Sequence, residues 1–246
     1  MCDFFSGLGM PDGDVRWHDA IDSHSDLVSY FEMSDLDDDA KFAKLELTPG
    51  DDPLDINTWA FQLDEDARPS WVTNDLLVRW EARMRSIVSR QTITTGTIEI
   101  IADGFWILGG DAKVNKMIAG RVLGLRGKAT ITDVRGGTIT DVWGSASITD
   151  VWGGTISNVS GSASITDVRG GTISNVSGSA SIRNVWGGTI TDVRGSASIR
   201  NVSGSASIRN VWGGTISNVS GLASITDVWG SALLDESAKR HVVTKG

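Results

Sequence analysis

Cysteine, proline and long apolar runs are scarce in this chain. Its 246 residues include one cysteine, Cys2, and 4 prolines. A single cysteine excludes a disulfide framework and any metal site built from several cysteines. The apolar runs are too short to span a bilayer, so we expect no membrane partner. The opening residues, MCDFFSGLGMPDGD, contain neither a basic segment nor an apolar core of signal-peptide length, and this predicts a cytoplasmic protein.

Charge is distributed unevenly along the chain. Residues 1–95 contain 20 acidic and 8 basic side chains, a net charge of −12, whereas residues 96–246 contain 11 and 14, a net charge of +3. Two compositions in one chain indicate two domains. We therefore expect an acidic N-terminal domain over residues 1–95, a second domain over 96–232 and a C-terminal cap or tail over 233–246.

The second domain is built from an internal repeat. Isoleucine recurs every 8 or 9 residues from Ile131 to Ile225, and a valine follows each isoleucine three residues later. The unit is about 17 residues long, with one slip over residues 196–204, where two nine-residue units follow each other. Degenerate copies extend the pattern back to about residue 97.

Short apolar segments interrupted by glycine cannot form helices, and each unit can bury its Ile and Val only by stacking on the next unit. The pattern therefore predicts a parallel β-solenoid with about 17 residues per coil. The residue before each valine is always Asp or Asn, and because these residues suit turns, we expect them at the corners of the coil. The number of sides stays open, although anchor spacings of three and five would suit four sides. The array resembles the class of solenoids that includes pentapeptide-repeat and hexapeptide-repeat proteins, but it matches neither consensus.

The first 95 residues show ordinary helix and strand signals. Residues 25–33 and 76–89 have capped or amphipathic helical patterns, and residues 41–47 and 58–63 alternate like strands. The complete prediction is a mainly β protein, in which a small α+β domain precedes the solenoid.

The N-terminal residues also carry a resemblance. The opening MCDFFSG, the DSHSD helix start and the segment from Trp59 to Trp71, followed by an array entered through GFWILGGDAKV, are similar to uncharacterised proteins of phages and prophages with an MCxF-type N-terminal domain. The resemblance implies a phage accessory protein that acts in the host cytoplasm. It implies no particular reaction.

Residues 1–95 contain few candidates for chemistry. Cys2 becomes the terminal residue if the initiator methionine is removed, and a terminal cysteine is the nucleophile of class II glutamine amidotransferases. Their start resembles MCG, whereas Asp3 stands here in place of the glycine. An incidental thiol is the simpler interpretation.

Two further sets of residues suggest metal ligands. Asp35, Asp37, Asp39 and Glu46 occupy positions 1, 3, 5 and 12 of an EF-hand loop, but Ala40 replaces the required glycine and the following residues resemble a strand. A solvated acidic loop is the alternative. His18 and His24 have acidic neighbours but no metal-binding spacing. The sequence predicts no cofactor.

The position after each valine alternates between Arg, Trp and Ser. When this position is followed through every second copy of the repeat, its residues form two rows along the solenoid. In these rows, Arg on one coil is expected to stack on Trp of the next coil. This arrangement is either a structural cation–π ladder or an exposed surface for a partner. The candidate partner-binding residues are Trp143, Trp152, Arg169, Trp186, Arg194, Trp212 and Trp229.

Three functions remain open. The first is a non-enzymatic interaction protein that binds a host protein, or alternatively nucleic acid, with homo-oligomers forming through the tail or the solenoid ends. The second is an enzyme with Cys2 as nucleophile and the solenoid as scaffold. The third is a self-assembling or ice-binding-like solenoid with threonine rows such as Thr138/Thr140, which we expect Arg183, Arg200 and Arg209 to interrupt.

Overall fold

The chain divides into two compact units, Met1–Thr92 and Ile93–Gly246. The computed structural model describes residues 5–33 and 42–243. The first unit contains helices and a small antiparallel sheet, and the second contains two parallel sheets. The mainly β fold, with a parallel β-solenoid after a small α+β region, is confirmed.

The N-terminal unit is a four-stranded antiparallel sheet with two helices. The strand order is β2-β1-β3-β4. The elements are β1 (Phe5–Gly9), β2 (Val15–Arg16), α1 (His24–Tyr30), β3 (Ala43–Thr48), the 3-10 helix η1 (Ile56–Thr58), β4 (Ala60–Leu63) and α2 (Asn74–Arg90).

Helix α2 packs its apolar side against this sheet. Thr73 caps the helix by accepting a hydrogen bond from the Leu76 backbone N–H. Trp80 is fully buried, and its Nε1 donates to the Met10 carbonyl at 3.0 Å. A Cβ on Gly9 would lie 2.7 Å from the Trp80 ring, so only glycine lets β1 approach the helix this closely.

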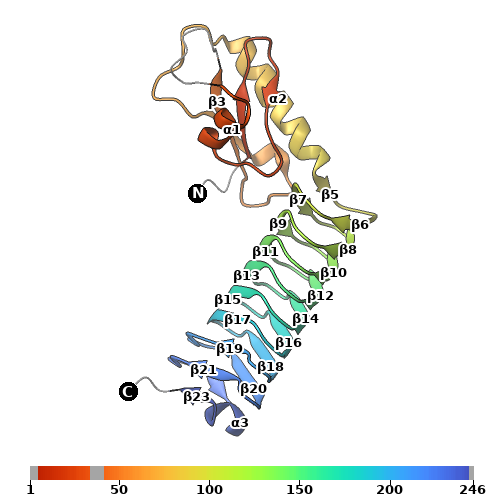
Figure 1. Ribbon diagram of the computed structural model, residues 1–246, viewed down its shortest axis with the longest axis vertical. Coiled ribbons are helices and arrows are strands. Elements are labelled where there is room, and N and C mark those ends of the chain that lie inside the picture. Colours follow the sequence, from red (N-terminus) through yellow and green to blue (C-terminus); the bar gives the residue numbers. More distant parts are fainter. Residues whose placement is uncertain (1–4, 34–41, 244–246) are drawn as a thin grey trace. The chain divides into compact units, whose positions relative to one another are not determined.

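The second compact unit, Ile93–Gly246, contains all the repeats, and we call it the repeat unit. It consists of two sheets in which neighbouring strands are parallel (Figure 1). The nine-stranded sheet contains β6 (Thr97–Ile101), β8 (Lys113–Met117), β10 (Thr130–Val134), β12 (Ser147–Val151), β14 (Ser164–Val168), β16 (Ser181–Val185), β18 (Ser198–Val202), β20 (Thr215–Val219) and β22 (Leu233–Leu234). The ten-stranded sheet contains β5 (Thr92–Ile93), β7 (Phe105–Leu108), β9 (Arg121–Leu125), β11 (Thr138–Val142), β13 (Thr155–Val159), β15 (Thr172–Val176), β17 (Thr189–Val193), β19 (Ser207–Ile208), β21 (Ser224–Thr226) and β23 (Val242–Val243).

The coil has two strand-bearing sides, not the four that the anchor spacing suits. Ile131 and Val134 belong to the same strand, β10, and both are buried. Side chains three residues apart point to opposite faces of a regular strand. However, the register between β10 and β12 pairs every residue of β10 except Thr132 with its equivalent, so the alternation is interrupted between the two anchors. One strand thereby delivers both anchors to the core.

Glycine and alanine complete the turns between the sheets. Gly137 has a φ of +83°, and a Cβ there would lie 2.6 Å from the Gly120 carbonyl oxygen of the coil below. Only glycine tolerates both conditions. Ala146 and Ala163, which each precede a strand, are fully buried in the same core as the Ile and Val anchors.

Ten of the twelve Asp and Asn residues before the valines lie inside strands, so the prediction that they are corner residues is wrong for these ten; Asn210 and Asp227 lie outside strands. Their side chains form ladders along the stack, in which Asn184 donates to Asp167 at 2.6 Å and Asn201 donates to Asn184 at 2.9 Å. An amide can donate to one neighbour and accept from the next, whereas a carboxylate only accepts. An aspartate therefore begins the ladder and asparagines continue it.

The slip in the repeat is absorbed locally. Ile208 pairs with Ile190, 18 residues earlier, whereas Ile225 pairs with Ile208 at the usual interval of 17. Strand β19 is reduced to two residues. Four residues near the slip have left-handed backbones, and all are of a type that tolerates this conformation: Asn201, Asn210, Asn218 and Asp227.

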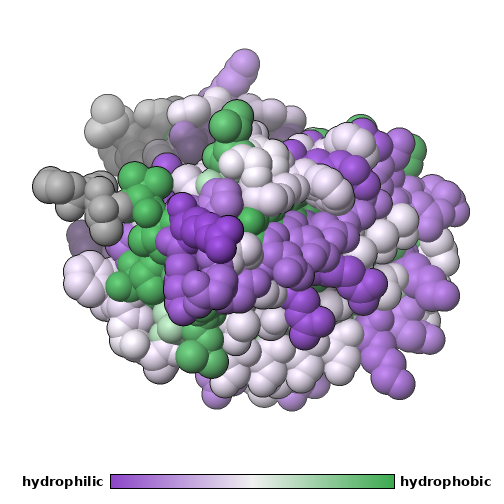
Figure 2. All heavy atoms as spheres, turned by 90° about the horizontal axis from the view of Figure 1, so that it is seen from below, coloured by the Kyte–Doolittle hydropathy of each residue, from purple (hydrophilic) through white to green (hydrophobic). Residues whose placement is uncertain are grey.

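The C-terminal residues continue both sheets and cover the edge of β20. Strands β22 and β23 pair with β20 and β21, and a short helix, α3 (Glu236–Lys239), lies between them. The Asp235 carboxylate accepts from the Asn218 N–H at 2.8 Å, and the Ser237 hydroxyl accepts from the Val219 N–H at 2.9 Å. Seen from this end of the repeat unit, the surface is mainly hydrophilic or neutral, with smaller hydrophobic patches (Figure 2). No helix within the described residues is long and apolar enough to cross a membrane.

Candidate functional site

The position after each valine forms two rows along the edges of the solenoid. We define the first edge as the residues that follow strands of the nine-stranded sheet, and the second edge as those that follow the ten-stranded sheet. On the first edge, the backbone N–H of Trp152 donates to the Val134 carbonyl at 2.8 Å, and that of Arg169 donates to the Val151 carbonyl at 2.8 Å. Residues 17 apart therefore lie on neighbouring coils, as the repeat predicts.

On the first edge, Trp152 is enclosed by two arginines. The Arg135 guanidinium lies 4.5 Å from the centre of its ring and that of Arg169 lies 4.7 Å away. These distances are within the range of cation–π attraction, which contributes about 0.5–1 kcal/mol per exposed pair. The Trp152 ring is therefore already in contact with side chains of its own chain.

The arginines of this edge also neutralise a stack of aspartates. Asp133, Asp150 and Asp167 occupy equivalent positions on three successive coils, where like charges repel. Arg135 pairs with Asp133 at 2.8 Å. Arg169 contacts both Asp150, at 3.2 Å, and Asp167, at 3.3 Å. Each arginine thus serves the tryptophan and the carboxylates together.

The second edge contains three kinds of contact. Arg126 lies 5.4 Å from the centre of the Trp143 ring. Arg194 pairs with Asp192 at 3.7 Å. Trp212 and Trp229 stack on each other, with ring centres 5.8 Å apart and an interplanar angle of 20°.

Trp186 differs from the other tryptophans of the two edges. All five are 45–53% exposed. Trp186 has neither a cation nor another ring stacked on it among the residues that the structure describes. The next residue in its row is Ser203, whose side chain is too small to cover an indole. Trp186 therefore presents the least covered aromatic ring of the first edge.

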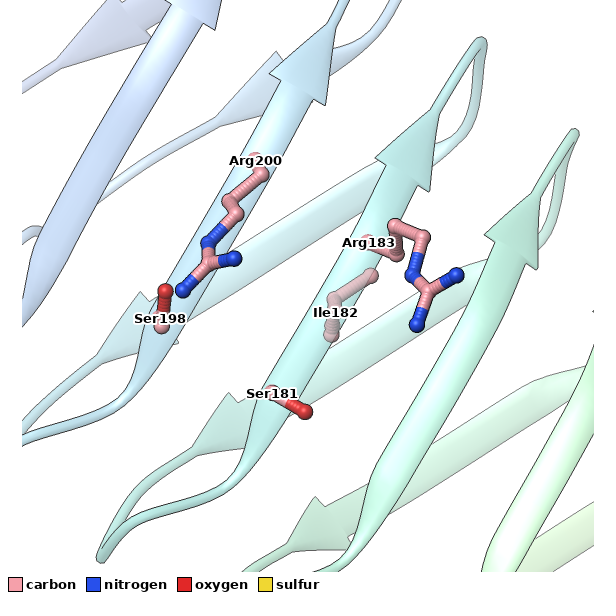
Figure 3. A pocket seen from close by; sticks show the side chains of 5 residues that line it. All are labelled: Ser181, Ile182, Arg183, Ser198 and Arg200. Carbon is pink, nitrogen blue, oxygen red and sulfur yellow. The ribbon is translucent and has the colours of Figure 1, made fainter.

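Two arginines on neighbouring strands line a hollow on the outer face of the nine-stranded sheet, and Trp186 follows one of these strands. Arg183 lies in β16 and Arg200 lies in the neighbouring strand β18. With Ser181, Ile182 and Ser198 they line a space of about 120 Å³ (Figure 3). Within the described part of the chain, neither guanidinium is ion-paired with an acidic side chain. We refer to Arg183, Arg200 and Trp186 as the β16–β18 patch.

Arg183 and Arg200 do not interrupt the threonine row that contains Thr138, because they belong to the other sheet. In the ten-stranded sheet, four threonines stack in register without interruption: Thr138, Thr155, Thr172 and Thr189. In the neighbouring row of that sheet, Thr140, Ser157, Ser174 and Thr191 follow one another, and Arg209 interrupts the row before Thr226.

The structure describes only some of the candidate site residues of the N-terminal unit. Cys2, Asp35, Asp37 and Asp39 lie outside the described residues. Glu46 is buried in β3, a strand, whereas an EF-hand loop is followed by a helix. His18 is partly exposed, and its Nδ1 accepts from the Ala20 N–H at 3.1 Å, which makes it a turn residue.

Sequence reasoning missed two features of these surfaces. It grouped Arg183 and Arg200 with interruptions of a threonine row, although their spacing of 17 residues already places them on neighbouring coils. It also considered His24 and Glu46 separately, because no recognised spacing connects them.

The fold defines the class of the second unit as a parallel β-solenoid. No family model matches the chain, and comparisons with curated proteins and with solved structures give no match either.

Proposed function

We propose that this protein is a non-enzymatic binding protein, and that the β16–β18 patch contacts an acidic surface of a partner protein. The observation that carries the proposal is the contrast among the arginines of the repeat. Arg135, Arg169 and Arg194 each pair with an aspartate of the same strand. Arg183 and Arg200 have no such partner among the described residues, although they line one hollow from neighbouring strands.

Guanidinium groups suit carboxylates because each offers several N–H donors in a planar fork, and Arg183 and Arg200 bring two of them to the lining of one hollow. Arginine and tryptophan are also the residues that most often dominate the binding energy of protein interfaces. Trp186 directly follows the strand that carries Arg183, so both residues are available to one partner.

The resemblance of the N-terminal residues to phage and prophage proteins supports a more specific proposal. The partner is then a host protein, the setting is the host cytoplasm, and the role is host takeover or protection from a host defence. The acidic N-terminal domain would provide a second contact surface in the same complex. These points depend on the resemblance alone.

Capture from host lysate with the full chain as bait tests the β16–β18 patch. The double variant Arg183→Thr/Arg200→Thr introduces the residue found at the equivalent position of β14, Thr166, so we expect it to fold normally. We expect it to lose at least nine-tenths of the captured protein. The matched control is Arg194→Ser, which removes an arginine already paired with Asp192 and should keep the capture.

Two results would contradict the proposal. Equal capture by the wild type and the double variant would exclude the patch as the contact. Loss of the captured protein after nuclease treatment would show that nucleic acid, not an acidic protein surface, is what the patch binds.

The in-register threonine row supports ice binding as a second candidate. Flat rows of threonine are what that function requires, and Thr138 to Thr189 form one over four coils. The two candidates are separated by an ice-recrystallisation assay with Thr155→Lys and Thr172→Lys, which leave the β16–β18 patch intact. An inactive wild type removes this candidate.

A further inference from the structure

The buried polar side chains of the N-terminal unit gather at one place. Among the described residues, only Ser6, His24 and Glu46 are polar and buried, with exposures of 1%, 9% and 5%. Ser6 and Glu46 face each other across the β1–β3 pair. His24 is the first residue of α1, and one of its ring nitrogens lies within 4.8 Å of carboxylate oxygens of both Glu46 and Asp64.

The surroundings of His24 provide acceptors on both sides of its ring. Nε2 lies 3.0 Å from the Leu45 carbonyl oxygen, and because a carbonyl only accepts, Nε2 carries a proton and donates it. Nδ1 lies 3.1 Å from Oδ2 of Asp64. Nδ1 therefore faces a carboxylate, and a positive centre bound at Nδ1, either a proton or a metal ion, satisfies this arrangement.

Glu46 is the second buried group of this cluster. Its carboxylate is buried and accepts from Nε2 of Gln62 at 2.7 Å. Within the described residues it forms no ion pair with a lysine or arginine. Burying a carboxylate without a compensating positive charge is unfavourable. A metal ion bound at Nδ1 of His24 would compensate Glu46 as well as Asp64.

We propose that His24, Glu46 and Asp64 form a binding site for a divalent transition-metal ion, with Zn²⁺ as the best match. One imidazole and two carboxylates are ligands that Zn²⁺ accepts, whereas Ca²⁺ and Mg²⁺ take oxygen ligands. Two ligands at about 2.0–2.2 Å from one tetrahedral ion are separated by about 3.3–3.6 Å. The 3.1 Å between Nδ1 and Oδ2 is slightly shorter, so a small rotation of the half-exposed Asp64 side chain would admit the ion.

The groups around the three ligands support this assignment. Metal-binding histidines usually donate their second ring nitrogen to a carbonyl or carboxylate, and Leu45 provides such a carbonyl. Gln62 orients Glu46 in the same way. Asp64 is half-exposed and borders a hollow of about 480 Å³, so an ion can enter from solvent and water can complete its coordination.

Equilibrium dialysis of the full chain against micromolar Zn²⁺, with bound metal measured by mass spectrometry, tests the site. All proteins carry Cys2→Ser, because a free thiol is a competing zinc ligand. We expect about one Zn²⁺ per chain, and at least tenfold weaker binding in His24→Gln, Glu46→Gln and Asp64→Asn. The matched control is His18→Gln. It removes a histidine whose Nδ1 also lies near a carboxylate, 3.4 Å from Oδ1 of Asp19, but outside the proposed site. We expect this variant to bind Zn²⁺ as tightly as the parent.

The Asp64→Asn variant separates loss of the metal site from loss of the fold, because Asp64 is half-exposed. We expect its circular dichroism spectrum to match that of the parent. Absence of stoichiometric Zn²⁺ from the parent would overturn the proposal. So would unchanged binding in Asp64→Asn. Competition by equimolar Ca²⁺ would likewise contradict a site that depends on an imidazole.

Discussion

The two units of the chain differ in how their cores are specified. In the N-terminal unit each buried side chain has its own neighbours, such as Trp80, which fits against Gly9 and occurs once. In the repeat unit, Ile and Val occupy the same two positions on coil after coil, and each anchor packs on a copy of itself. A core of unique contacts depends on every member, whereas a stack of equivalent contacts distributes its stability over many interfaces.

Replacement of Trp80 by alanine should therefore have the largest effect. Trp80 is fully buried, and removal of a buried tryptophan side chain costs about 3–5 kcal/mol. We expect amide hydrogen exchange to increase throughout β1, β3 and α2, while β10 to β20 keep their protection. Equal loss of protection in both units would mean that they do not fold independently, and the comparison would fail.

Replacement of Ile165 by alanine should have a smaller and more local effect. The side chain is buried between equivalent residues of two neighbouring coils, Ile148 and Ile182. Its loss should cost about 2–4 kcal/mol, and increased hydrogen exchange should be greatest in β12, β14 and β16 and decline with distance along the stack. Uniform loss of protection from β6 to β22 would show that the repeat unfolds as one body.

The same difference explains how much of the fold the sequence predicts. The repeat strands and their register follow from Ile and Val at fixed intervals, because any other register would break the stacking of every coil. The sequence does not predict that the coil has two sides. This depends on the interruption of the strand at Thr132, which is a backbone feature that no particular residue type marks. Strand β1 was missed because its two glycines argue against a strand, although Gly9 is required by the close approach of Trp80.

The candidate sites show the same limit. The Arg and Trp rows could be predicted because periodicity places residues 17 apart side by side. The sequence could not predict that Arg183 lacks an acidic partner, because this depends on which side of the sheet the aspartates occupy. His24, Glu46 and Asp64 come together through α1, β3 and the end of β4, and no periodic signal connects those elements.

A comparison of two tryptophans sharpens the distinction between structural and partner-binding residues within the repeat. Trp152→Ser removes contacts with Arg135 and Arg169 and should cost about 1–2 kcal/mol. Trp186→Ser removes no cation–π contact, and we expect it to change the free energy of unfolding by less than about 0.5 kcal/mol. Urea unfolding measures both, and serine already occupies this position at Ser203 and Ser220. If Trp186→Ser destabilises the chain more than Trp152→Ser, the assignment of their roles is reversed.

The smallest expected effect concerns the last coil, where the repeat ends on unique contacts. Hydrogen bonds from the Ser237 hydroxyl and from the backbone N–H groups of Asn218 and Ala238 lower the pKa of Asp235 from 3.8 to about 2. A pKa that is lowered in the folded state stabilises this end above pH 3.8, and the contribution disappears as the pH falls through about 2. Protonated Asp235 loses acceptor capacity for these donors.

Amide exchange near this end measures the effect. We expect the protection factor of the Asn218 amide, which donates to Asp235, to fall between pH 4 and pH 2, while that of the interior Trp152 amide stays constant. Asp235→Asn should show the reduced protection already at pH 7 and no further decrease on acidification. An identical pH profile in wild type and Asp235→Asn would show that the terminal edge is held by β22 and α3 alone. The end of the stack would then resemble its interior, where equivalent neighbours maintain each coil without a specific cap.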